Sequence, residues 1–457
     1  MKTKALIIAA LLLSLPAAAQ EGLVLSIDRC REMALEHNSG AVNAALDVEA
    51  ARYQKQEALT EYFPRISAMS AGFWSLNPML EIGLKDILGN NDYSNNLQNE
   101  LLMQGINPKY TALEHGYGAS VNLLQPVFAG GRIVNGNRLA ALGVEAAQLQ
   151  KSLQERKTGE EIDDYYWQTL SLEEKLLTLG EFRELLDTLC KDASSARAAG
   201  LMTEDELLQA ELKRSELRSS EIKLRSGIRL SKMNLLNAIG QDYCVVEGAA
   251  SEGKPYIDDI RLEDEGAELQ SPERYYVPEE KISASMEEAR LLELQVDAKK
   301  LEKQMQLGET LPQLAVGASY GYSDLIGKAR FNGTAYATLQ IPISDWWKTS
   351  RKLKRLQVQI DKAENEQAQL DGQLTLLVRK YWIELTSAWD EYEVALDSER
   401  AAEVAYRSVK SHYDAGLVPL SDLLQSQASY RQSCNGLTDA RTAYRKALRV
   451  WMDIADL

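Results

Sequence analysis

The chain contains an internal repeat that occurs in two registers. A shift of 248 positions takes Pro64 to Pro312, and a shift of 216 positions takes Pro126 to Pro342. Because the two shifts differ by 32, the first half holds about 32 more residues between its two prolines than the second half does. The sequence therefore predicts a fold with an internal two-fold repeat, in which each half uses the same elements in the same order.

Each half includes a very long stretch without proline. The stretch from Pro126 to Gly200 has the same length as the corresponding stretch that begins at Pro342. A loop would not preserve its length in this way, whereas a helix would, because its length places its far end. The second copy has the three-four spacing of a coiled-coil seam at Leu385, Ala388, Tyr392, Ala395, Ala402, Tyr406, Val409 and Tyr413. We therefore predict helices over 131–198 and 347–413, each about 100 Å long at 1.5 Å per residue.

Shorter helices complete each half and meet the long helices at two similar turns. They are predicted over 28–61, 203–240, 279–308 and 419–454. In each half their summed length nearly equals that of the long helix, so they can stack end to end beside it. The turns read "AAGLMTEDEL" and "DAGLVPLSDLL". A glycine in each turn suits the left-handed residue beyond a helix end. The expected turn residues are Gly200 with Leu201 and Gly416 with Leu417, and both turns should lie at one common tip.

Pairs of strand-like segments flank the opposite ends of the long helices. They fall within 65–125 and 312–342, and alternate positions in each segment are apolar. Four strands provide too little sheet for a soluble sandwich, and in lipid four strands cannot close a barrel without open edges. The chain must therefore oligomerise, and three copies would give twelve strands. The aromatic residues Trp74, Tyr117, Tyr320 and Tyr322 are placed as expected at a membrane interface.

The remaining features limit the compartment and the chemistry. Residues 1–19 are predicted to be a secretory signal peptide, with two lysines, an apolar run and a final Ala-Ala-Ala. The net charge of −16 argues against a nucleic-acid ligand. The three histidines and four cysteines show no metal-ligand spacing, and no carboxylate is paired with a nucleophile. We predict no metal, no cofactor and no enzymatic activity.

Three further segments are distinguished by composition. Residues 241–278 interrupt the helical pattern with glycine, proline and acidic residues, and they should link a first repeat over 20–240 to a second over 279–457. The additional residues around 75–115 are predicted to form the longer external loop, either plugging or decorating the barrel mouth. Helix lengths place Cys30 and Cys244 near the linker, either as a disulfide or as two thiols.

The ordered set of features resembles a known family. The signal peptide, the two halves, both "GL…LLQ" turns and both joints of strand, proline and long helix resemble the TolC-like outer membrane efflux proteins over essentially the whole mature chain. The resemblance implies a homotrimer with a 12-stranded transmembrane β-barrel and a long periplasmic α-helical coiled-coil barrel. It implies an exit duct of a tripartite efflux or type I secretion system, served by a periplasmic adaptor (membrane fusion) protein and an inner-membrane RND or ABC transporter. Pro126 and Pro342 would then mark the joints between barrel and tunnel, and the linker would form an equatorial collar.

The resemblance also implies a gate at the periplasmic mouth. Asp422 matches a position whose acidic side chains ring the closed mouth, and Glu206 holds the equivalent place in the first half. Tyr413 matches an aromatic residue used in the links that hold the mouth shut. Gln425 stands where the family has a second acidic residue, and Val418 stands where an arginine can occur, so this gate must be fastened differently. Helix capping is the alternative role for Asp422.

A different class of function also fits part of the pattern. A secreted trimeric coiled-coil scaffold or adhesin would explain secretion, heptads and repeats, but it does not need apolar strands that return at both proline joints. A periplasmic adaptor would need a lipoyl-like or barrel domain, for which the sequence gives no signal. Extraction behaviour separates these classes, since only the duct should need detergent for release from outer membranes.

Overall fold

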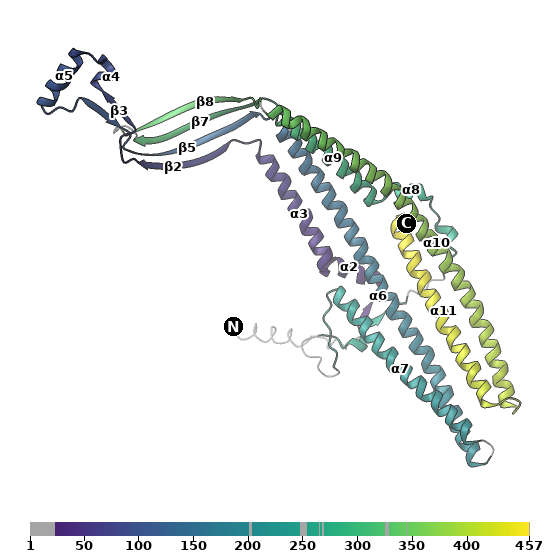
Figure 1. Ribbon diagram of the computed structural model, residues 1–457. Coiled ribbons are helices and arrows are strands. Elements are labelled where there is room, and N and C mark those ends of the chain that lie inside the picture. Colours follow the sequence, from purple (N-terminus) through teal and green to yellow (C-terminus); the bar gives the residue numbers. More distant parts are fainter. Residues whose placement is uncertain are drawn as a thin grey trace, which may run out of the picture. The chain divides into compact units, whose positions relative to one another are not determined.

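The computed structural model describes residues 23–200, 203–246, 254–264, 266, 269–324, 329–343 and 345–456. The predicted signal peptide and Leu201 lie outside these residues. The chain forms two compact units (Figure 1). The helical unit contains Met1–Val48, Ala147–Leu291 and Gln367–Leu457, and the sheet unit contains Glu49–Ala146 and Leu292–Glu366.

The sheet unit is built on four antiparallel strands. They are β2 (Arg65–Trp74), β5 (His115–Phe128), β7 (Gln313–Asp324) and β8 (Arg330–Gln340), in the order β2-β5-β7-β8. The predicted strand pairs are thus present, and the central pairing of β5 with β7 joins the two halves of the chain. Within the part of the chain that the structure describes, the edge strands β2 and β8 each have a partner on one side only.

The two faces of the sheet differ in chemistry, as the alternating sequence predicts. Strand side chains alternate between faces, so cross-strand partners share a face. The small and polar face carries Ser67, Ser120, Asn122, Ser319, Asn332 and Thr334. The apolar face carries Ile66, Val121, Tyr320, Phe331 and Leu339, all exposed in the single chain. Met69, Phe73 and Tyr336 are large residues on the small and polar face.

The joint between the sheet and the first long helix lies later than the sequence predicted. Pro126 lies within β5, where the pairing with β7 shifts register, and such a bulge tolerates a residue that lacks an N–H donor. The chain instead turns at Gly130 and Gly131, which have φ of 64° and 78°. A Cβ on Gly130 would overlap the carbonyl of Gly308, so only glycine fits. Pro342, by contrast, does lie between β8 and the next helix.

The two long helices match their predicted spans to within two residues. They are α6 (Arg132–Ala198) and α10 (Asp345–Asp414), of 67 and 70 residues. The return helices α7 (Glu204–Ala238) and α11 (Leu420–Ala455) also match. No described helix has the length and hydropathy needed to cross a bilayer.

The two remaining predicted helices are each interrupted once. The first consists of α2 (Ile27–His37) and α3 (Ser39–Thr60), because Asn38 leaves the helical conformation and its side chain accepts a hydrogen bond from the Gly40 backbone at 2.8 Å. The second consists of α8 (Glu279–Ser285) and α9 (Glu287–Gly308), separated by the extended and buried Met286. Neither break has a proline inside the helix to announce it in the sequence.

The described part of the linker packs on the helical unit. Its β6 (Arg261–Leu262) pairs in parallel with β1 (Val24–Leu25), and the 3₁₀ turns η1 (Ile257–Asp259) and η2 (Pro272–Tyr275) flank it. The fully buried Tyr166 of α6 places its hydroxyl 3.0 Å from the Leu25 carbonyl and 2.6 Å from the Glu263 carbonyl. Tyr166 therefore anchors both short strands to the long helix.

The cysteines are not bonded to each other. All four lie in the described residues, and none forms a disulfide. Cys30 is fully buried in the cluster that includes Ile257 and Ile260 of the linker, as its predicted position near the linker requires. Burial raises the pKa of the Cys30 thiol to about 12. Of the two alternatives for Cys30 and Cys244, the structure has the thiols.

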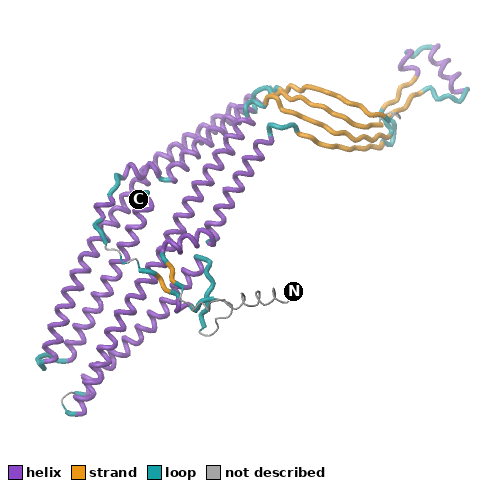
Figure 2. Tube along the Cα trace, turned by 180° about the vertical axis from the view of Figure 1, so that it is seen from behind, coloured by secondary structure: helices purple, strands orange, loops and turns teal. Residues whose placement is uncertain are grey.

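The additional residues of the first half form a small folded insert rather than a simple loop. We call residues 75–114 the insert. It contains β3 (Leu80–Gly83), α4 (Leu84–Leu88), α5 (Asp92–Met103) and β4 (Lys109–Ala112), and β3 pairs with β4. Figure 2 shows its helices beyond the ends of the sheet strands. The Asn91 side chain and Ser94 cap α5 reciprocally, which explains how an asparagine-rich segment can be ordered.

Candidate functional site

The candidate gate residues lie at the two turns that join each long helix to its return helix. Gly200 and Gly416 both have a left-handed backbone, with φ of 75° and 70°. At the second turn the backbone N–H groups of Gly416 and Leu417 each donate to carbonyls of the last turn of α10, both at 2.9 Å. These bonds satisfy carbonyl groups that the helix end leaves unpaired. The Leu417 side chain is 72% exposed, so it does not stabilise the turn by burial.

Glu206 completes a helix cap at the start of α7. The Thr203 backbone N–H donates to its carboxylate at 3.1 Å, and the Glu206 backbone N–H donates to the Thr203 hydroxyl oxygen at 3.4 Å. This reciprocal pair is a capping box, and loss of such a cap costs about 1 kcal/mol. The Glu206 carboxylate is therefore committed to holding the turn.

Asp422 occupies the same position in the second turn but has a different role. The N-cap of α11 is Pro419, which offers no side-chain acceptor. The exposed Asp422 carboxylate accepts one hydrogen bond, from the neighbouring Ser421 hydroxyl at 3.2 Å. A carboxylate in the first turn of a helix is favoured by the helix dipole. Capping is thus carried by Glu206 in the first turn, while Asp422 stays available to other partners.

Tyr413 lies in the last turn of α10, three residues before Gly416. Its half-buried ring packs on a cluster contributed by both long helices and both return helices. Burial raises the pKa of Tyr413, and the carboxylates of Glu206, Asp192 and Asp414 raise it further. The structure therefore brings Tyr413 of α10 near Glu206 of α7.

The base beneath the turns is apolar and tightly packed. Tyr406 of α10 and Tyr430 of α11 stack with ring centroids 5.7 Å apart, and the buried Gln427 donates to the Phe182 carbonyl at 3.3 Å. The most buried members of the cluster are Leu186, Ala210, Leu420 and Leu423. Gln425 is exposed, and its side chain makes no hydrogen bond among the described residues. The structure does not join Gln425 to the other candidate residues.

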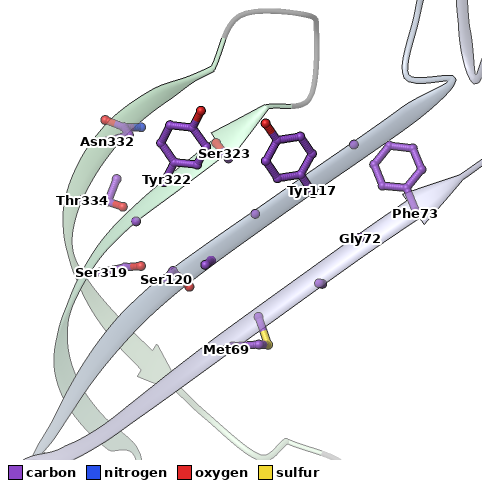
Figure 3. A pocket seen from close by; sticks show the side chains of 15 residues that line it. Met69, Gly72, Phe73, Tyr117, Ser120, Ser319, Tyr322, Ser323, Asn332 and Thr334 are labelled. Atoms are coloured by element: carbon purple, nitrogen blue, oxygen red, sulfur yellow. The ribbon is translucent and has the colours of Figure 1, made fainter.

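A second candidate surface is the small and polar face of the sheet. Residues of all four strands, most of them from this face, line a pocket of about 380 Å³ (Figure 3). Small residues line the pocket, among them Gly118, Ser120 and Gly321. Gly321 also allows β7 to approach β5 closely, because a Cβ there would overlap the Ala119 carbonyl and Ser120. Only Met69 and Phe73 add bulk from β2. This pocket leaves space for solutes, and its lining offers hydroxyl and amide groups without a charged side chain. Arg65 and Arg330 lie outside the pocket on the same face. Among the described residues, no group of histidine, cysteine or acidic side chains could hold a metal ion.

Solved structures with the same fold are outer membrane channels. The CmeC outer membrane channel of Campylobacter jejuni is 13% identical, with a TM-score of 0.72 over 94% of this chain and 85% of that one. VceC of Vibrio cholerae is 13% identical, with a TM-score of 0.70 over 94% and 96%. The MtrE outer membrane channel of Neisseria gonorrhoeae is 14% identical, with a TM-score of 0.67 over 94% and 88%. At these identities the likeness establishes the fold, which is that of TolC-like outer membrane channels.

A domain match within the second half of the chain agrees with this fold. Residues 287–450 carry an outer membrane efflux protein domain. Among curated proteins, no sequence matches the chain. The resemblance drawn from the paired turns and joints is thereby confirmed, and so is the outer membrane location that it implied. The domain is that of a family of channels rather than enzymes, in agreement with the prediction made from the missing catalytic groups.

Proposed function

We propose that the protein is the outer-membrane exit duct of a tripartite efflux or type I secretion system. The observation that carries the proposal is the four-stranded sheet with one apolar face, one small and polar face, and two edges unpaired among the described residues. Open edges are not tolerated in lipid, because each unpaired backbone group there costs several kcal/mol. Pairing β2 of one copy with β8 of the next removes every edge, and three copies close a 12-stranded barrel.

The two faces then acquire distinct roles. The apolar face, with Tyr320 and Phe331, meets lipid, and the small and polar face lines an aqueous lumen. α6 and α10 extend the duct into the periplasm as an α-helical barrel that repeats the same elements twice in each copy. The protein contributes a passive path, so an inner-membrane RND or ABC transporter supplies the energy and an adaptor protein joins the two.

The turns at Gly200 and Gly416 form the periplasmic mouth in this proposal. Three copies of Asp422 would converge there, and like charges a few ångströms apart repel unless cations or protons offset them. Around these carboxylates, the cap formed by Glu206 holds the start of α7, and the Tyr413 side chain packs on the cluster shared by the four helices. The mouth should attract cations and open when contacts between the helix pairs are weakened.

Fractionation of membranes from cells that express the full chain tests the proposal. The protein should resist extraction by salt, require detergent, float with outer membranes and have the mass of a trimer by native mass spectrometry. In planar bilayers the trimer should conduct ions. Release by a salt wash would favour the coiled-coil scaffold instead, and a detergent-extracted monomer would remove the closed barrel.

A further inference from the structure

The insert carries an unusual amount of exposed apolar surface for a segment at an aqueous boundary. Its large apolar side chains that are at least half exposed come from both strands or the turns beside them and from both helices. They are Leu76, Met79, Ile87, Tyr93, Leu102, Met103, Ile106 and Tyr110. Met103, at the end of α5, is 90% exposed. Concentrations of exposed apolar groups mark interaction surfaces more often than solvent-facing loops.

The composition of the insert argues against a lipid surface as its partner. Residues 75–114 contain five acidic residues and two lysines, and they contain no arginine and no tryptophan. The segment therefore has a net charge of −3, which disfavours anionic lipid headgroups. One of the two lysines, Lys109, is already paired with Glu81. Segments that settle on membranes instead combine basic residues with aromatic anchors.

The connection of the insert to the sheet indicates which protein surface is within reach. The insert continues the β2–β5 hairpin, and the Ser75 backbone N–H donates to the Glu114 carbonyl at 2.7 Å. β2 is an edge strand, so in the proposed barrel it lies against β8 of the neighbouring copy. In that barrel each insert therefore rises at a subunit boundary, and all three inserts surround the same mouth. This argument rests on the proposed trimer.

We propose that the inserts of neighbouring copies dock on one another through their exposed apolar side chains and form a cap at the external mouth of the duct. The occupant of each apolar surface is thus a second copy of this chain. The reciprocal caps at Asn91 and Ser94 fix the start of α5, so the helix that carries Tyr93 and Met103 is ordered before any contact forms. The cap adds intersubunit contacts beyond those of the barrel strands.

Cross-linking on intact cells tests the docking. A Met103→Cys variant treated with a short bismaleimide should give a covalent dimer on denaturing gels. The reagent joins two thiols, and each subunit contributes one new thiol, so the third subunit stays unlinked. The wild-type chain, treated in the same way, shows how much cross-linking arises from its four native cysteines, of which Cys30 and Cys190 are buried. A Met103→Asn variant should lower the temperature at which the detergent-solubilised trimer dissociates, whereas Lys85→Asn, at an exposed polar position of α4, should not.

The outcomes separate this inference from the proposed function. A trimer that floats with outer membranes but gives only monomeric Met103→Cys after cross-linking would overturn the cap and leave the duct intact. Unchanged dissociation temperature in Met103→Asn would count against the cap in the same way. A chain that is monomeric in detergent would overturn both.

Discussion

At the scale of single residues, two acidic side chains in equivalent positions perform different tasks. Glu206 accepts a hydrogen bond from the Thr203 backbone, while Asp422 follows a proline that cannot act as a side-chain cap. The sequence shows both as acids six residues beyond a glycine. Only the hydrogen bonds reveal that the Glu206 carboxylate caps its helix, whereas the Asp422 carboxylate accepts one bond from its neighbour Ser421.

Replacement of Asp422 should therefore affect ion selectivity, whereas replacement of Glu206 should affect stability. Asp422→Ala should reduce the cation selectivity of single channels and change stability by no more than about 0.5 kcal/mol, as is usual for an exposed site. Glu206→Ala should cost about 1 kcal/mol and increase hydrogen exchange at the start of α7. Both variants should remain trimeric, because in the proposed assembly the barrel strands join the copies and neither acid lies in a strand. Unchanged selectivity in Asp422→Ala would remove the electrostatic part of the gate.

The buried thiol of Cys30 predicts a specific pH dependence. Its folded pKa is raised to about 12 by burial, whereas an unfolded chain releases this proton near the ordinary value of 9.0. The folded state therefore binds more protons above pH 9, so stability is full below that value and falls as pH rises toward 12, by at most about 1.4 kcal/mol per pH unit.

Alkylation with mass-spectrometric detection checks this prediction on the native protein. Because the thiolate is the reactive form, Cys30 should remain unlabelled at pH 8 in the folded chain and become labelled in denaturant. Cys244, which is less buried, provides the internal comparison. Equal labelling of both cysteines in the folded state would show that Cys30 is accessible and that its environment is not the apolar cluster.

At the scale of elements, the joint between β5 and α6 depends on the absence of a side chain at one residue. Gly130 has a left-handed backbone and lies against the Gly308 carbonyl, where a Cβ would overlap. Gly130→Ala should destabilise the sheet unit by more than the 1–2 kcal/mol expected from the backbone conformation alone. The measurement is the midpoint of thermal unfolding followed by circular dichroism.

Gly143, inside α6, offers a control for the effect of replacing a glycine that has no close contact. Apart from its chain neighbours and the nearby backbone of α6, no atom lies within 4 Å of the position that a Cβ would occupy, and the Gly143 backbone is helical. Gly143→Ala should therefore stabilise α6 by about 0.5–1 kcal/mol, because alanine loses less conformational entropy than glycine. If both substitutions had the same effect, the close approach at Gly130 would not be the reason for its glycine.

At the scale of the whole molecule, the proposed barrel predicts that adjacent residues of one strand respond oppositely to a charge. Val121 lies on the apolar face and Ser120 on the small and polar face that lines the pocket. Val121→Lys should cost up to about 2–4 kcal/mol if its site lies near the bilayer midplane, and it should reduce the amount of trimer in outer membranes.

The same substitution on the other face should be tolerated. Ser120→Lys should insert normally and shift channel selectivity toward anions, because the added charge faces water in the lumen. Quantitative blotting of outer membranes and bilayer recordings provide the two measurements. A strand whose two faces tolerated lysine equally well would not lie in lipid.

Much of the architecture could be predicted because it is encoded in local patterns. Helical spacing without proline predicted the ends of α6 and α10 to within two residues. The alternation of apolar and polar residues predicted which side chains share a face of the sheet. The breaks at Asn38 and Met286 were missed because no proline or glycine marks the residue itself, and the break depends on local side-chain bonds and burial. The insert was missed because its caps are made by asparagine and serine, which are also the residues of loops.

The sequence by itself determined the periodic elements, because they depend on spacing along the chain, and its ordered turns and joints pointed to the family by resemblance. The tertiary structure decided where the first sheet-to-helix joint lies and which acidic side chain caps a helix, since neither depends on spacing along the chain. It moved the joint from Pro126 to Gly130, since a bulge lets β5 continue and the approach of Gly308 fixes where the turn can occur. It also distinguished Glu206 from Asp422, because the use of a charge depends on which donors lie within hydrogen-bond distance, and that is set by the fold around it.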